Sequence, residues 1–194
     1  MRRLLAAGLA ALALSACAPD QPRFQNADVT GASFGRDFAL ADANGKTRRL
    51  ADFRGMAVVV FFGYTQCPDV CPATMATLAE AMRKLGMDSH RVQGIFITLD
   101  PERDTPELLS RYVPAFHQTF LGLRGDAAQT ENVAKEFKVV YRKVPGASAD
   151  SYTVDHSAGM FIFDPEGRLR LFASHGVSAD ALARDLRELL RMLE

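Results

Sequence analysis

The sequence of 194 residues predicts an α/β fold, in which one sheet is covered by helices on both faces. Two continuous apolar runs, Met56–Phe62 and Val92–Leu99, are typical of strands that are buried on both sides. Helix-forming segments alternate with these runs, and a terminal hairpin precedes a closing amphipathic helix. At roughly 100–200 residues per domain, the chain provides one domain with a sizeable core.

The first predicted elements are an edge hairpin, a central strand and a helix. Phe34–Leu40 and Thr47–Leu50 flank Asp42-Ala43-Asn44-Gly45, a sequence typical of a tight turn. Met56–Phe62 is apolar and β-branched, so it suits the middle of the sheet. Ala73–Leu85 is rich in helix formers, carries an apolar stripe and ends before Gly86, a common helix stop.

The middle of the chain continues the alternation. Val92–Leu99 is the second buried strand. After it, Thr105 is expected to cap a helix that has Pro106 at its first position. Phe120–Leu123 is predicted to be a short strand, and Ala127–Phe137 the helix that follows it.

The chain closes with a hairpin and a helix. Ala158–Phe163 and Leu169–Ala173 flank the turn sequence Asp164-Pro165-Glu166-Gly167, and Ser178–Leu193 is amphipathic. Val139–Asp155 fits no element, so we expect a long loop there, an insertion of the kind that often carries function. The order of elements matches a thioredoxin-like fold with an N-terminal β-hairpin extension.

The charge balance argues against a nucleic-acid partner. Lys and Arg number 23, and Asp and Glu also number 23. The sequence pI is about 6.9. Because recognition of phosphate needs a basic excess, a neutral chain is not expected to bind nucleic acid.

The N-terminus has the pattern of an export signal. Met1-Arg2-Arg3 is basic, Leu4–Leu14 is apolar, and small residues follow. Leu14-Ser15-Ala16-Cys17 resembles the bacterial lipobox, in which the Cys is lipidated; an ordinary secretory signal is the alternative. We therefore predict a lipoprotein signal peptide over 1–17, lipidation of Cys17, a flexible tether over 18–30 and a folded domain over 31–194. This places the protein in the bacterial cell envelope, lipid-anchored and facing the periplasm.

With Cys17 assigned to lipid, Cys67 and Cys71 are the remaining thiols. They lie between a central strand and a helix, at the edge of an open α/β sheet where binding sites form. Their C-x-x-x-C spacing lets both sulfurs meet one metal or each other, so a redox pair and a structural disulfide are alternatives. Soft thiolates select Cu(I), zinc or iron–sulfur clusters. Clusters and structural zinc need four ligands, which favours copper.

One of four histidines has a position that suits a ligand. His156 directly precedes the predicted strand Ala158–Phe163, whose start faces the cysteine motif in thioredoxin-like folds. His90 and His117 are expected to be solvated, and His175 to belong to a turn. Two thiolates and the His156 imidazole would make a three-donor site for Cu(I) and Cu(II).

Three sequence blocks resemble the Sco/SenC family of copper chaperones. They are Phe62 to Pro72 (FGYTQCPDVCP), Thr98 to Pro106 (TLDPERDTP) and Val154 to Ser157 (VDHS), in the family's order. The resemblance implies a membrane-tethered thioredoxin-like domain that binds copper through Cys67, Cys71 and His156. The family helps to assemble the binuclear copper centre of cytochrome c oxidase. Gln66 departs from the His that many members carry, but that position is not a core ligand.

Several nearby residues have weaker assignments. The resemblance places Asp100 near the metal, where it would orient a ligand; a turn or cap role is equally open. Asp155 is expected to orient the loop or the His156 ring, and Asp69 to lie exposed between the cysteines. Met75 and Met160 are expected to fill the core.

Two functions follow from the same thiols. In the first, a metallochaperone takes copper from a periplasmic donor and passes it to the copper-receiving subunit of cytochrome c oxidase, which favours the inner membrane. In the second, Cys67 and Cys71 form a redox-active dithiol, and the protein is a thiol–disulfide reductase for the oxidase's cysteines. His156 discriminates between them, because a reductase has no need of a histidine ligand.

Overall fold

The computed structural model describes residues 23–147 and 151–192. Within these residues, eight strands form one mixed sheet. In sheet order they are β1 (Ala27–Asp28), β10 (Leu169–Ser174), β9 (Gly159–Phe163), β4 (Ala57–Gly63), β5 (Val92–Thr98), β6 (Leu121–Arg124), β2 (Ala39–Asp42) and β3 (Thr47–Arg49). Cys17, the residue predicted to carry lipid, lies outside the described residues.

The centre of the sheet is parallel. β4 pairs with β5, and β5 with β6, so the carboxyl ends of all three strands meet at one edge. β9 lies antiparallel on the other side of β4. Every residue of β4 and β5 is buried, as expected for strands covered on both faces.

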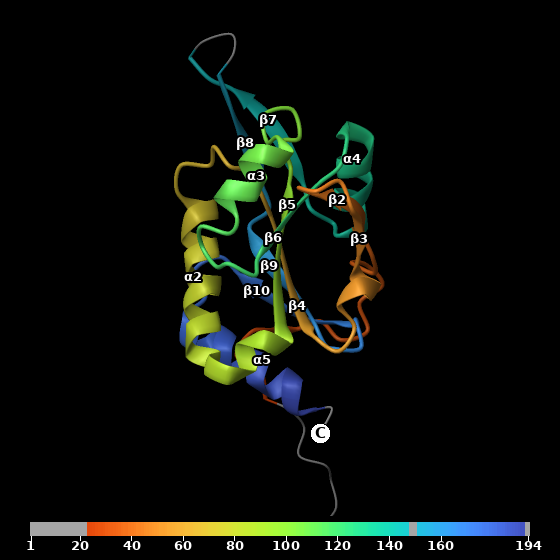
Figure 1. Ribbon diagram of the computed structural model, residues 1–194, viewed down its shortest axis with the longest axis vertical. Helices are drawn as coiled ribbons and strands as arrows, with labels where there is room; N and C mark the ends of the chain where they lie inside the picture. Colours follow the sequence, from red (N-terminus) through yellow and green to blue (C-terminus); the bar gives the residue numbers. More distant parts are fainter. Residues whose placement is uncertain (1–22, 148–150, 193–194) are drawn as a thin grey trace, which may run out of the picture.

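Helices cover both faces of the sheet. α2 (Val70–Leu85), α3 (Pro106–Tyr112) and α5 (Ala179–Arg191) lie on one side, and α4 (Ala127–Glu136) lies on the other (Figure 1). Short 3-10 helices, η1 (Leu50–Phe53) and η2 (Gly86–Arg91), complete the connections. The predicted α/β class is confirmed. No helix in the described ranges is long and apolar enough to span a bilayer.

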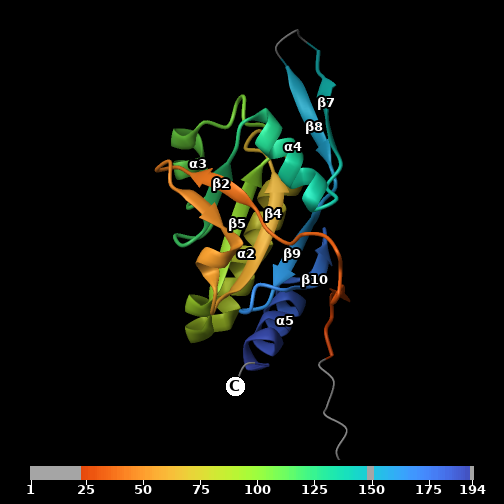
Figure 2. The ribbon, with the colours of Figure 1, turned by 90° about the vertical axis from the view of Figure 1, so that its right-hand side faces the viewer.

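The predicted loop over Val139–Asp155 is wrong. β7 (Tyr141–Pro145) and β8 (Tyr152–His156) form an antiparallel hairpin that makes a separate two-stranded sheet (Figure 2). Among the residues of these two strands, only Val154 is buried. Because the hairpin stands out from the core, its strands show too little apolar alternation to predict a strand.

Two element boundaries also differ from the prediction. The first edge strand occupies Ala39–Asp42 instead of Phe34–Leu40, because Gly35 has a φ of +62° and its N–H donates to the Glu136 carbonyl. α2 begins at Val70 rather than Ala73, so that Cys71 lies in the first helical turn.

The N-terminal segment is fastened to the domain by a buried carboxylate. Asp185 of α5 is fully buried and accepts hydrogen bonds from the backbone N–H groups of Gln25 and Asn26 and from the Asn26 side chain, at 2.8–3.1 Å. Ala27 and Asp28 then pair with β10. The flexible tether expected over 18–30 therefore does not extend to residue 30; residues 25–28 belong to the fold.

These hydrogen bonds to Asp185 predict a large effect of Asp185→Ala on stability. The substitution leaves the Gln25 and Asn26 donors without their acceptor, and we expect the free energy of unfolding to fall by about 2–4 kcal/mol in chemical denaturation. Asp180→Ala is the matched control on the same helix, because Asp180 is exposed and pairs with Lys84 at the surface. Equal stability of the two variants would contradict this role for Asp185.

Candidate metal centre

Three side chains from separate segments meet at the carboxyl end of β4. The sulfurs of Cys67 and Cys71 and a ring nitrogen of His156 all lie within 4.8 Å of one another. Cys67 belongs to the loop after β4, Cys71 to the first turn of α2, and His156 to the end of β8. The sequence prediction that these three residues come together is confirmed.

Cys71 is packed against the central strand. Its side chain is fully buried, and a Cβ built on Gly63 would lie 2.9 Å from its sulfur. Glycine at the last position of β4 thus makes room for the thiol; any larger residue would displace Cys71. Burial and the neighbouring Cys67 raise the pKa of the Cys71 thiol.

Cys67 is the more accessible thiol. It is partly exposed, and its sulfur accepts a hydrogen bond from the backbone N–H of Cys71 at 3.3 Å. This contact places the sulfur at the N-terminus of α2, where a helix favours negative charge. Both cysteines are free thiols in the structure, without a disulfide between them.

The hydrogen bonds of His156 define its tautomer. Nδ1 lies 3.0 Å from the carbonyl oxygen of Ser157, which can only accept, so Nδ1 carries the proton. Nε2 is then free to accept, and it lies 3.5 Å from the Cys71 sulfur. The rings of Phe61 and Tyr64 stand edge-on to the imidazole, with centroids 6.2 and 6.3 Å away. Nε2 of His156 therefore faces the thiols.

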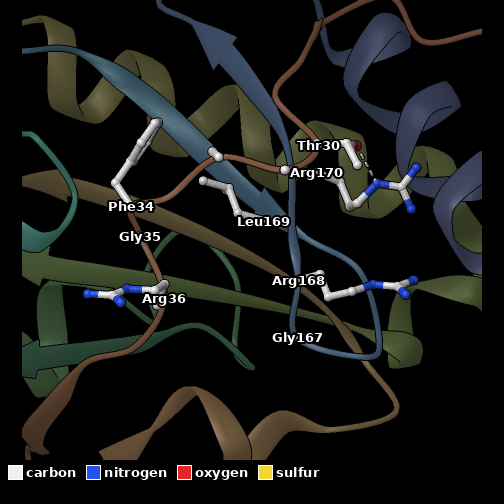
Figure 3. A pocket seen from close by; sticks show the side chains of 10 residues that line it. Thr30, Phe34, Gly35, Arg36, Gly167, Arg168, Leu169 and Arg170 are labelled. Carbon is white, nitrogen blue, oxygen red and sulfur yellow. Dashed lines mark hydrogen bonds between the residues drawn. The ribbon is translucent and has the colours of Figure 1, made fainter.

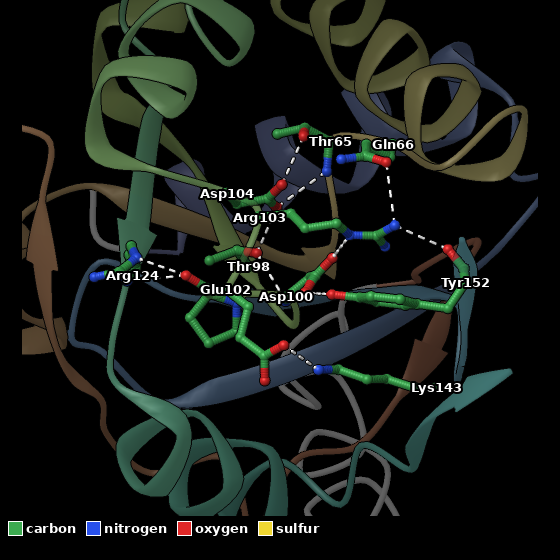
Figure 4. A network of polar contacts seen from close by, with 11 residues as sticks. Thr65, Gln66, Thr98, Asp100, Glu102, Arg103, Asp104, Arg124, Lys143 and Tyr152 are labelled. Carbon is green, nitrogen blue, oxygen red and sulfur yellow. Dashed lines mark hydrogen bonds and ion pairs between the residues drawn. The ribbon is translucent and has the colours of Figure 1, made fainter. Parts of the chain in front are cut away.

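Asp104 holds the cysteine loop. Its carboxylate is fully buried and accepts hydrogen bonds from the Thr65 backbone N–H at 3.0 Å and the Thr65 hydroxyl at 2.6 Å (Figure 4). The Thr98 hydroxyl is a third donor. Burial raises the pKa of the Asp104 carboxyl, and these hydrogen bonds oppose that rise. The sequence reasoning did not identify this residue, although it lies within the TLDPERDTP block.

Asp100 and Asp155 differ in their surroundings. Asp100 is fully buried, accepts a hydrogen bond from the Tyr152 hydroxyl at 2.7 Å and forms an ion pair with Arg103. Asp155 is exposed and pairs with Arg142 across the β7–β8 hairpin at 3.2 Å. Nδ1 of His156 meets Ser157 and not Asp155, so of the two expected roles, orienting the loop or the ring, the Asp155 contact within the hairpin fits the first.

The other three histidines contact partners other than the thiols, and two methionines lie in the core. His90, His117 and His175 contact Met87, Thr119 and Thr74, respectively. Met75 and Met160 are each 1% exposed and fill the core, as predicted. Asp69 is exposed at the N-cap of α2 and makes no side-chain cap bond.

A pocket of about 520 Å³ shares no residue with this centre (Figure 3). Phe34 and Leu169 contribute its apolar wall. In Figure 3 the Arg36 side chain points away from those of Arg168 and Arg170, and each arginine has a partner. Arg36 pairs with Glu136, Arg168 with Asp164 and Glu166, and Arg170 with Asp164. Its charges are thus already neutralised within the fold.

The family model for SCO1/SenC matches residues 26–191 of this chain. The chain belongs to the SCO1/SenC family. It is 39% identical over 153 residues to the mitochondrial SCO2 homolog of Bos taurus, covering 78% of this chain and 58% of that protein. It is 34% identical over 168 residues to a SCO2-like protein of Rickettsia felis, covering 85% of this chain and 82% of that protein. The chain thus spans less than two thirds of the bovine relative.

Solved structures share this fold. Bradyrhizobium japonicum ScoI with copper bound has a TM-score of 0.74 at 37% identity, covering 81% of this chain and 99% of that one. Apo Sco1 from Thermus thermophilus has a TM-score of 0.77 at 40% identity, covering 87% of this chain and 98% of that one. The predicted thioredoxin-like architecture is confirmed by these members of the family.

The unequal environments of the two thiols predict unequal reactivity. Iodoacetamide attacks the thiolate, and burial with a raised pKa disfavours that form at Cys71. We expect Cys67 of the reduced protein to be alkylated about 10-fold faster than Cys71 at pH 8, as followed by peptide mass spectrometry. The unfolded protein is the control, in which the two rates should converge. Faster alkylation of Cys71 in the folded protein would contradict this description.

Proposed function

We propose that this protein is a copper metallochaperone that binds copper through Cys67, Cys71 and His156. The observation that carries the proposal is the convergence of two sulfurs and one imidazole nitrogen within 4.8 Å. Ligand atoms at this spacing need only small movements to surround one ion. Bradyrhizobium japonicum ScoI and yeast Sco1 have both been solved with copper bound, which supports this assignment.

The donor set suits copper in both oxidation states. Thiolates are soft ligands that select Cu(I), and imidazole also binds Cu(II). The Ser157 carbonyl, which accepts from Nδ1, holds the ring in the orientation that directs Nε2 to the metal. Copper must displace the thiol protons when it binds, so affinity should rise with pH.

A chaperone also needs a route for release. Cys67 and His156 are partly exposed whereas Cys71 is buried, so an acceptor's ligands can replace the accessible donors one at a time. We propose that the receiver is a copper-site subunit of cytochrome c oxidase and that a periplasmic protein supplies the copper. This delivery rests on the family resemblance of the three sequence blocks.

Reduction of the oxidase's cysteines by the Cys67–Cys71 dithiol is the second candidate. The two free thiols favour this function. The accessible Cys67 can attack the target's disulfide, and Cys71 can then displace the target from the mixed disulfide. The position of His156 favours the copper function, because thiol–disulfide exchange does not need a ring nitrogen directed at the sulfurs.

Copper titration of His156→Ala tests the three-donor site. Wild-type protein should bind one equivalent of Cu(II) with a sulfur-to-copper charge-transfer band. The variant should lose at least about 10-fold in Cu(II) affinity, because imidazole is removed from the site. His175→Ala is the matched control, since His175 is exposed and contacts Thr74 instead.

Thiol chemistry separates the two functions. His156→Ala should leave the redox titration of the Cys67–Cys71 pair nearly unchanged. An unchanged Cu(II) affinity and spectrum in His156→Ala would exclude the three-donor site. Disulfide reduction by a wild-type protein that binds no copper would instead establish the reductase.

We further propose that lipid on Cys17 anchors the protein to the inner membrane and that the domain faces the periplasm. Cys17→Ser should move the protein from the membrane fraction to the soluble fraction on cell fractionation, because the residue that would carry the lipid is removed. Continued membrane association of this variant would refute the lipid anchor. Ser15→Thr, with Cys17 intact, should remain in the membrane fraction.

A further inference from the structure

The guanidinium of Arg103 contacts both segments that carry the proposed ligands. Its Nη1 donates to the Gln66 side-chain oxygen at 3.1 Å and to the Tyr152 carbonyl oxygen at 2.9 Å (Figure 4). Gln66 directly precedes Cys67, and Tyr152 is the first residue of β8, the strand that ends at His156. Arg103 therefore bridges the cysteine loop and the histidine strand.

The placement of His156 depends on how β8 meets the body of the protein. The β7–β8 hairpin is not hydrogen-bonded into the eight-stranded sheet. Tyr152, Val154 and His156 alternate along β8, so their side chains share one face, and this face is the less exposed one. A contact that holds Tyr152 thus also sets the distance of His156 from the thiols.

We propose that Arg103 is a positioning residue that holds the His156 imidazole at bonding distance from a metal on the two cysteines. The inference rests on the proposed three-donor copper site and assigns a role within it to a residue that does not touch the metal. The Arg103 side chain is 18% exposed, and its Nε also pairs with the buried Asp100. The ion pair with Asp100, two residues after the end of β5, thereby holds the guanidinium in place.

Arginine suits this position for geometric reasons. The planar guanidinium directs Nε toward Asp100, while Nη1 reaches Gln66 and Tyr152. Its flat face also lies 3.5 Å from the centroid of the Tyr152 ring. Lysine has one charged nitrogen and no planar face, so it cannot make these contacts together. The position thus requires the shape of arginine as well as its charge.

The inference predicts an effect that depends on the oxidation state of copper. Two thiolates suffice for Cu(I), whereas Cu(II) depends more strongly on imidazole. We expect Arg103→Met to weaken Cu(II) binding about 10-fold and to shift the charge-transfer band toward that of His156→Ala. Cu(I) affinity, measured by competition with a chromophoric chelator, should change by less than about two-fold.

Two further variants make the test specific. Arg142→Met removes the same charge from the exposed face of β7, next to Asp155, but breaks no bridge to the cysteine loop; its Cu(II) affinity should match the wild type. In the double variant Arg103→Met/His156→Ala, the arginine has no ring left to position. Its Cu(II) affinity should therefore equal that of His156→Ala alone.

The outcomes separate this inference from the proposed function. Equal losses of Cu(I) and Cu(II) affinity in Arg103→Met, or a double variant that binds Cu(II) more weakly than His156→Ala, would overturn the positioning role. If wild type and His156→Ala bind Cu(II) alike, the three-donor site fails and the inference fails with it. If Arg103→Met does not fold by circular dichroism, Arg103→Lys serves instead: a loss confined to Cu(II) supports the role, and wild-type Cu(II) affinity excludes it.

Discussion

The geometry of the metal centre depends on two buried carboxylates that follow β5. Asp104 accepts hydrogen bonds from Thr65 in the cysteine loop, whereas Asp100 accepts one from Tyr152 on the histidine strand. An ionised carboxylate in the interior is costly unless donors surround it. Here the donors come from the segments that carry the ligands. Displacement of either segment would remove hydrogen-bond donors from a buried carboxylate, so the need to satisfy these groups restrains the site.

The two halves of the site have different mechanical support. The cysteine half rests on β4, whose residues are all buried. Gly63 lets Cys71 approach the backbone, and the loop that carries Cys67 leads from β4 into α2. The histidine half belongs to a hairpin outside the main sheet, with Val154 as its buried contact. Sulfurs supported by the sheet and a separately held imidazole suit the proposed transfer of copper, because the imidazole can withdraw without displacing the thiols.

Sequence patterns predicted the parts of the structure that follow simple rules. Continuous apolar runs identified β4 and β5, and the C-x-x-x-C spacing identified the two thiols, because both are local patterns. His156 was predicted from its place before a strand of the expected thioredoxin-like fold and from the family resemblance of the VDHS block. The β7–β8 hairpin escaped prediction because Val154 is the one buried residue of its strands, and the alternation of Tyr152, Val154 and His156 is too short to identify a strand. The roles of Asp104, Asp185 and Arg103 depend on partners distant in the sequence, and no local pattern reveals which donors will surround a buried charge.

The fastening of residues 25 and 26 to α5 has a consequence for how the domain is presented. The described chain begins at the end of the molecule opposite the carboxyl end of β4, beside α5 (Figure 2). A surface that holds the protein by residues before 23 would therefore lie at one pole, with the thiols and the imidazole at the other. In that arrangement Cys67, Cys71 and His156 face partners that approach from the side away from that surface.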